Sequence, residues 1–182
     1  QNSGATIEFT KKNVNSKSYF FNQDGEMLSQ FIEVSADNLG ADSGLKAGMY
    51  YFGGDDDGSM KTGSQSIKDN TGDTYKFYFY TKDQTTDKYQ TPKYGKKLKK
   101  GAGVVGNQSN KLYYYGLLLT ADDYKYQLAT ITDENGVEHT FIVNKNGSIQ
   151  KNRVDYKEDN EVLFTTKNLP KDAFVTDSTA WK

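Results

Sequence analysis

The residues of this chain best suited to chemistry are aromatic side chains, which occur in short runs. An aromatic ring offers a flat apolar face, on which the apolar face of a sugar ring can stack. Successive side chains of a strand point to opposite faces, so we expect the flanking residues of each run to pack inward and the middle residue to meet a ligand. The candidates are Phe20, Tyr51, Tyr78 and Tyr114. The alternative is that these rings serve only core packing, and a one-residue change of strand register would exchange the two faces.

A second candidate site is a dense group of lysines, Lys96, Lys97, Lys99 and Lys100, in the sequence KYGKKLKKGAG. Four ammonium groups so close together would hold a polyanion, and salt would weaken that binding by screening the charges. The alternative is a solvated hairpin edge, on which lysines discourage strand-to-strand aggregation.

The sequence GDDDG at 54–58 gathers three carboxylates, but it does not predict a metal site. A calcium loop supplies six or more oxygen ligands at set intervals and ends in a bidentate acid, which three adjacent aspartates do not match. A solvated turn is the favoured interpretation. The chain has no cysteine, which excludes disulfides and Cys-ligated zinc. We expect no metal and no cofactor.

Catalysis finds little support in these residue types. His139 is the only histidine, and it lies in GVEHTF without the context of a nucleophile elbow. There is no His-Glu-x-x-His motif and no phosphate-binding glycine loop. Carboxylate pairs for glycoside cleavage can lie far apart in a chain, but short repeats offer no deep pocket to raise the pKa of an acid. We therefore expect a protein that is not an enzyme.

Composition and charge set further limits. The 182 residues suffice for one domain or one run of repeats. The 23 basic and 24 acidic side chains give a net charge of −1, which predicts no general affinity for nucleic acid. No apolar run approaches the roughly 18 residues that span a bilayer, so no transmembrane segment is expected. The first residues, QNSGATIEF, lack the apolar region of a signal peptide, so an exported form would be a mature or excised piece.

The aromatic runs belong to a repeat that predicts a β-hairpin. SYFFNQDGEML (18–28) has aromatics, an Asp-Gly turn and then Met; MYYFGGDDDGSMK (49–61) has a turn two residues longer, and TFIVNKNGSIQ (140–150) carries Asn-Gly. Aromatics favour strands, and Asp-Gly or Asn-Gly supplies the positive φ angles of a tight turn. Two copies are degenerate: KFYFYTKD (76–83), whose predicted partner strand comes only at GKKLKKG (95–101), and LYYYGLLLTADD (112–123).

These repeats predict an all-β fold, a solenoid-like array of stacked β-hairpin repeats. A short hairpin is marginal in water and becomes stable by stacking on its neighbours. We predict a single repeat module over 1–182, with about five repeats at approximately 17–31, 48–67, 74–103, 110–123 and 138–153.

The order of aromatics, Asp-Gly and Ser-Met-Lys-Thr-Gly resembles the cell-wall-binding repeats of Gram-positive surface proteins, which include choline-binding modules and glucan-binding repeats. GLKAGMYYFGGDDDGSMKTGSQSI (44–67) is the closest match. The resemblance implies a β-solenoid that is exposed on, or attached to, the bacterial envelope. In choline-binding repeats, tryptophans of the motif form a cation–π cage. The position before the aromatics holds Ser18, Met49, Lys76, Leu112 and Thr140 here, and the position after the turn holds Ser64, Phe31 and Arg153. The lone Trp181 lies next to the C-terminus, so choline binding is not expected.

Repetition and resemblance together predict a non-catalytic module that binds cell-wall or extracellular glycan and attaches a surface or secreted protein to the bacterial envelope. The expected partners are cell-wall polysaccharide or teichoic acid and the other domains of a larger surface protein. The expected location is extracellular or cell wall-associated, in a Gram-positive bacterium. The alternative is a structural spacer or an adhesin module that meets a host protein without binding glycan. Middle aromatics exposed in adjacent pairs would favour glycan binding, and their burial would favour the spacer.

Overall fold

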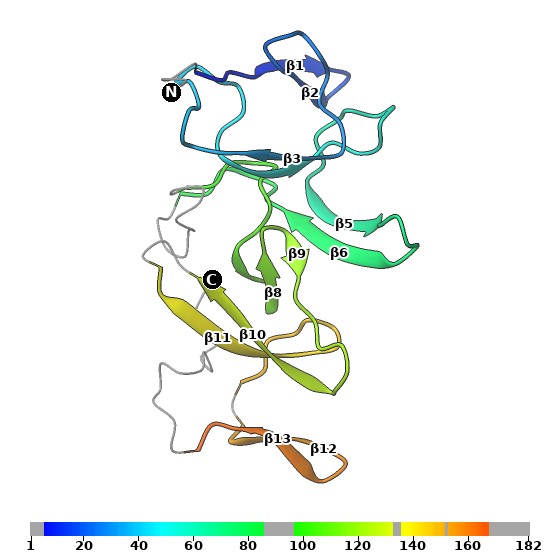
Figure 1. The fold of residues 1–182 in the computed structure, drawn as a ribbon, viewed down its shortest axis with the longest axis vertical. Coiled ribbons are helices and arrows are strands. Elements are labelled where there is room, and N and C mark those ends of the chain that lie inside the picture. The colour runs from blue at the N-terminus through cyan, green and yellow to red at the C-terminus, as the bar shows by residue number, and fades with distance from the viewer. Residues whose placement is uncertain (1–5, 86–96, 133–135, 152, 168–182) are drawn as a thin grey trace.

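The computed structural model describes residues 6–85, 97–132, 136–151 and 153–167, and this part of the chain contains strands but no helix, which confirms the all-β prediction. No helix that could cross a membrane is therefore found in it. Hairpins follow one another along the long axis, from β1 and β2 at one end to β12 and β13 at the other (Figure 1). The strands are β1 (Thr10–Val14), β2 (Lys17–Phe21), β3 (Phe31–Val34), β4 (Gly48–Tyr51), β5 (Gly63–Lys68), β6 (Thr74–Phe79), β7 (Gly106–Gln108), β8 (Lys111–Tyr114), β9 (Leu117–Leu118), β10 (Tyr126–Thr132), β11 (Glu138–Asn144), β12 (Asp155–Glu158) and β13 (Glu161–Thr165).

The described strands form several small antiparallel sheets. One sheet has five strands in the order β5-β6-β9-β8-β7, and β1–β2, β3–β4, β10–β11 and β12–β13 are two-stranded. No regular solenoid is detected in this arrangement. The hairpin β12–β13 has no counterpart among the five predicted repeats.

An asparagine and a glycine set the turns that follow β2 and β11. The side-chain oxygens of Asn22 and Asn144 each accept hydrogen bonds from the backbone N–H groups two and four residues later, at 2.9–3.0 Å. Gly25 and Gly147 have φ angles of 80° and 76°, in the left-handed region that favours glycine. The sequences NQDGE and NKNGS therefore fold into the same turn.

One backbone hydrogen bond recurs in five hairpins. The residue three positions after a turn glycine donates its N–H to the carbonyl of the strand before the turn. The pairs are Leu28 to Phe20, Lys61 to Tyr51, Val104 to Tyr78, Leu119 to Leu112 and Gln150 to Ile142, at 2.7–3.0 Å. Five stretches of different sequence and turn length thus share one hairpin geometry.

A second recurring backbone bond joins one hairpin to the hairpin before it. The donor is the N–H of the residue two positions after the turn glycine. The acceptor is a carbonyl of the preceding hairpin, two residues before the carbonyl that accepts the first recurring bond in that hairpin. The bonds run from Met60 to Ser18 (2.9 Å), from Gly103 to Met49 (2.7 Å) and from Ile149 to Asn110 (2.9 Å). At these three junctions successive hairpins are therefore stacked in the same register.

The interior is a thin layer rich in aromatic rings. Tyr50 and Phe52, which flank Tyr51, are 0% exposed, as expected from strand alternation. Strand β2 has the opposite orientation, because its middle residue Phe20 is only 2% exposed and packs on Phe52 with ring centroids 5.7 Å apart. A second, smaller core is formed by Tyr126, Ile142 and Tyr156.

Strand β6 has other partners than the sequence predicted. It pairs along its length with β5, which was not assigned as its partner, and Phe77 pairs with Leu117 of β9. The predicted partner, 95–101, contacts the segment that follows β6: Gly101 donates its N–H to the carbonyl of Tyr80, and the carbonyl of Leu98 accepts from the N–H of Gln84. Residues 95 and 96 lie outside the described residues.

Candidate glycan-binding surface

Aromatic rings lie side by side at the surface where β3, β4 and β6 meet. Phe31 contacts Tyr51 with ring centroids 4.6 Å apart, and Phe77 with centroids 5.1 Å apart. Phe31 is 39% exposed, while Tyr51 and Phe77 are half-buried. Tyr75, which is 44% exposed, stands two residues before Phe77 and therefore projects from the same face of β6. We call Phe31, Tyr51, Phe77 and Tyr75 the aromatic row.

Strand register and a buried ring hold the aromatic row in place. Phe31 and Tyr51 are directly opposite each other in the β3–β4 pair, a position in which side chains touch. Phe79 is 0% exposed, and its ring stacks on Phe77 at 6.0 Å and on Tyr51 at 6.3 Å. Two rings of the row therefore rest on a fixed support, which lowers the entropy lost when a ligand orders them.

A groove of about 320 Å³ lies beside Tyr75, between β9 and β10. Its lining includes the apolar side chain of Leu117 and the polar side chains of Thr120, Asp122 and Gln127. The Thr120 hydroxyl donates to the Asp122 carboxylate at 3.2 Å, and the Gln127 side-chain oxygen accepts from the Asp122 N–H at 3.1 Å. After these bonds, the Asp122 carboxylate, the Gln127 amide and the Thr120 hydroxyl each keep donor or acceptor capacity with which they can hydrogen-bond to sugar hydroxyls.

Aspartates surround the hydroxyl of Tyr75. The charge of Asp69 is the largest cause that raises the pKa of Tyr75 above its ordinary value of 10.0, and desolvation and the charge of Asp73 add to it. Tyr75 therefore keeps its proton at neutral pH. Its hydroxyl already donates a hydrogen bond to the Asp69 carboxylate, so toward a ligand at the end of the aromatic row it can only accept one.

Of the four aromatic residues predicted to bind a ligand, Tyr51 belongs to the aromatic row and Phe20 does not reach the surface. Phe20 is 2% exposed, so neither face of its ring is open to a sugar. The assignment of Phe20 as a stacking residue is corrected for this reason: β2 turns its middle residue inward and leaves Tyr19 and Phe21 half-buried.

Tyr78 and Tyr114 are half-buried, and Tyr114 lies on the same sheet face as Phe77 with β9 between them, because Tyr114 and Phe77 both pair with Leu117. Tyr78 is next to Phe77 in β6 and so projects from the other face, where its ring contacts Tyr113 at 5.8 Å. Tyr114 contacts Tyr115 at 4.2 Å. The recurring hairpin bond places Leu112, not Tyr114, at the position that corresponds to Tyr51.

The predicted lysine group is only partly described. Lys96 lies outside the described residues. Lys97 and Lys100 are exposed and Lys99 is half-buried. Lys99 and Lys100 line a groove that is separate from the aromatic row and that also contains Phe20.

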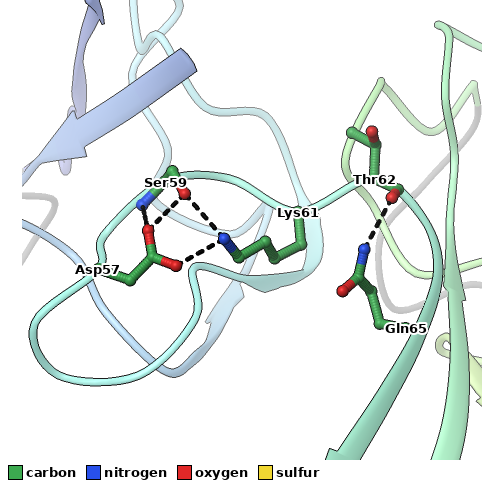
Figure 2. Close-up of polar contacts among 5 residues, drawn as sticks. All are labelled: Asp57, Ser59, Lys61, Thr62 and Gln65. Atoms are coloured by element: carbon green, nitrogen blue, oxygen red, sulfur yellow. Dashed lines mark hydrogen bonds and ion pairs between the residues drawn. The ribbon is translucent and has the colours of Figure 1, made fainter.

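Two carboxylates of the acidic turn 54–58 are bound by neighbouring residues of the protein, as Figure 2 shows for Asp57. The Asp57 carboxylate accepts hydrogen bonds from the N–H and the hydroxyl of Ser59 and forms an ion pair with Lys61 at 2.6 Å. The Asp55 carboxylate accepts from the Gln30 side-chain amide at 2.8 Å. The bond from Lys61, followed by those from Ser59, holds the pKa of Asp57 well below its usual value of 3.8. No cluster of three or more metal-ligating side chains occurs among the residues with described positions.

Replacing Asp57 by Asn is expected to lower the free energy of unfolding by up to about 1 kcal/mol at pH 7, the range of solvent-exposed ion pairs. The pKa of Asp57 is lower in the folded than in the unfolded chain. The ionised carboxylate therefore stabilises the fold fully above pH 3.8, and this stabilisation is lost as the pH falls through the pKa that Asp57 has in the folded chain. Urea unfolding near neutral pH and at about pH 2 should show the difference from wild type shrinking in acid. Asp56→Asn is the control, and an equal loss in both variants would contradict the assignment.

Phe31, Phe77 and Tyr75 were not predicted from the sequence. Phe31 has no aromatic neighbour in the chain, and Phe77 and Tyr75 do not occupy the middle of an aromatic run. The available signal was position: Phe31 follows directly after the first hairpin, where a strand must begin that pairs with the aromatic run at 50–52.

No protein-family model, curated protein or solved structure matches this chain. The resemblance of its hairpin motifs to cell-wall-binding repeats stays a prediction.

Proposed function

We propose that this protein is a non-catalytic module that binds glycan through the aromatic row. One observation carries the proposal: Phe31, Tyr51 and Phe77 come from three strands, and the Phe31 ring contacts both of the others at the surface. Rings in this arrangement offer a continuous apolar face to successive sugars of a polymer. The groove beside Tyr75 has an apolar part and supplies hydrogen-bonding groups from Thr120, Asp122 and Gln127 at one end of that face.

The proposed setting is the outside of a Gram-positive bacterium, where the module attaches a larger surface or secreted protein to cell-wall polysaccharide or teichoic acid. Three features support it: the resemblance of the repeats, the recurring hairpin bond and the constant register at three hairpin junctions. We propose further that the whole chain, 1–182, is one solenoid-like array of such hairpins. Affinity at one site should be weak, because the surface is shallow, and several modules on one polymer would add by avidity.

A structural spacer or host-protein adhesin is the second candidate, and the burial of other aromatics favours it. Phe20 is used in the core, and Tyr78 and Tyr114 contact neighbouring tyrosines. The adjacent pair of Phe31 and Tyr51 is not explained by this candidate, because Phe31 is 39% exposed.

The test is sedimentation of the purified chain with Gram-positive sacculi, with and without teichoic acid, across a salt series. Binding by aromatic stacking predicts retention on sacculi stripped of teichoic acid, with little dependence on salt. No retention on any sacculus would refute glycan binding and leave the spacer or adhesin.

A further inference from the structure

A second groove, of about 380 Å³, lies among the first three hairpins and gathers four lysines from distant parts of the sequence. Lys11 comes from β1, Lys46 from the segment before β4, and Lys99 and Lys100 from the segment after residue 97. We call this the lysine groove. Only the last two lysines belong to the group that the sequence suggested.

The charge of the lysine groove is poorly neutralised by the protein. Asp83 is the one acidic residue in its lining, and the Asp83 carboxylate accepts a hydrogen bond from the backbone N–H of Lys100 at 2.9 Å. The Lys46 ammonium donates to the carbonyl of Ala41 at 2.8 Å. Within the described residues, no hydrogen bond or ion pair engages the ammonium groups of the other three lysines. Lys61, by contrast, lies outside the groove and forms an ion pair with Asp57.

The floor of the lysine groove is apolar. Phe20, Leu45 and Tyr50 are at most 3% exposed, and Met60 is half-buried. The Tyr50 hydroxyl is already used, because it donates to the carbonyl of Lys46 at 2.8 Å. A ligand that fits this groove therefore needs negative charges at the rim and carbon-bound hydrogens toward the floor.

We propose that the lysine groove binds a phosphodiester-linked polyol chain. The phosphates would meet the ammonium groups, which bind phosphate as point charges, and the carbon units between them would lie over the apolar floor. The groove is distinct from the aromatic row, since Tyr50 lines the groove and the adjacent Tyr51 projects from the opposite face of β4. That the ligand is a polymer of the bacterial envelope rests on the proposed location of the protein. That the groove binds such a chain rests on its lysines and apolar floor alone.

The experiment measures binding of the whole chain to fluorescently labelled poly(glycerol phosphate) by anisotropy, across a salt series. The test variant replaces Lys11, Lys46, Lys99 and Lys100 by Gln. The control variant replaces four exposed lysines elsewhere, Lys68, Lys76, Lys157 and Lys167, by Gln and so removes the same charge. We expect at least tenfold weaker binding by the test variant, a change below twofold for the control, and affinity that falls with salt. Equal losses in both variants, or no loss in either, would overturn the proposal.

Three further polymers decide what the groove recognises. Inorganic polyphosphate, which has phosphates without carbon units, should bind more weakly than poly(glycerol phosphate), and so should polygalacturonate, which has carboxylates on sugars. Binding of single-stranded oligo(dT) or polygalacturonate as tight as that of poly(glycerol phosphate) would mean general attraction of polyanions and would overturn the proposal. Poly(glycerol phosphate) has no sugar ring, so a failure here leaves the result on stripped sacculi unaffected.

Discussion

Replacing Gly103 by Ala is expected to lower the free energy of unfolding by about 3 kcal/mol, as overpacking of a tight interior does. A Cβ atom at this position would lie 2.6 Å from the carbonyl carbon and oxygen of Tyr115 and 2.7 Å from the nitrogen of Gly116. These are backbone atoms, so no side chain can move aside. Gly103 also donates the bond to Met49 that joins two hairpins, and a shift of its backbone would disturb that junction.

Urea unfolding with a two-state fit measures this effect as a lower midpoint at unchanged slope. Gly54→Ala is the matched control, because Gly54 is exposed and nothing lies within 4 Å of a Cβ placed there. We expect the control to stay within about 0.5 kcal/mol of wild type. Equal stability of Gly103→Ala and wild type would contradict the close approach of the two hairpins.

The double substitution of Phe31 and Tyr51 by Ala is expected to weaken binding to stripped sacculi at least tenfold, or about 1.4 kcal/mol. The two rings form the central contact of the aromatic row, 4.6 Å apart, and their removal leaves only Phe77 and Tyr75 of the row. Neither ring is fully buried, so the variant should remain folded. A sedimentation isotherm measures the loss, and thermal unfolding reports the fold.

Tyr124→Ala is the control for this variant, because Tyr124 is 59% exposed and stands outside the aromatic row. It should bind sacculi as the wild type does. A folded double variant with undiminished retention would show that the aromatic row is not the binding surface.

The hairpins could be predicted because their information is local. A run of aromatic or β-branched residues followed by Asn-x-Asp-Gly or Asn-x-Asn-Gly specifies a strand and a turn whose donors are satisfied within five residues, as Asn22 and Asn144 show. Strand alternation also predicted the inward orientation of Tyr50 and Phe52 correctly.

The faces of the strands and their neighbours could not be predicted in the same way. The orientation of Phe20 depends on which side of β2 the second hairpin covers, and the sequence of β2 alone does not contain that choice. The contact of Phe31 with Phe77 joins residues 46 positions apart, through the stacking of two hairpins. The lysine groove has the same origin, since Lys11 meets Lys99 and Lys100 only after three hairpins have stacked.

The most direct test of glycan binding by the aromatic row is an NMR titration with a short, soluble peptidoglycan fragment, using protein labelled with ¹³C in its aromatic rings. We expect the resonances of Phe31, Tyr51 and Phe77 to shift progressively, while those of the buried Phe20 and of Tyr156 in the second core stay in place. Shifts confined to other rings, or no shifts at saturating fragment, would contradict it.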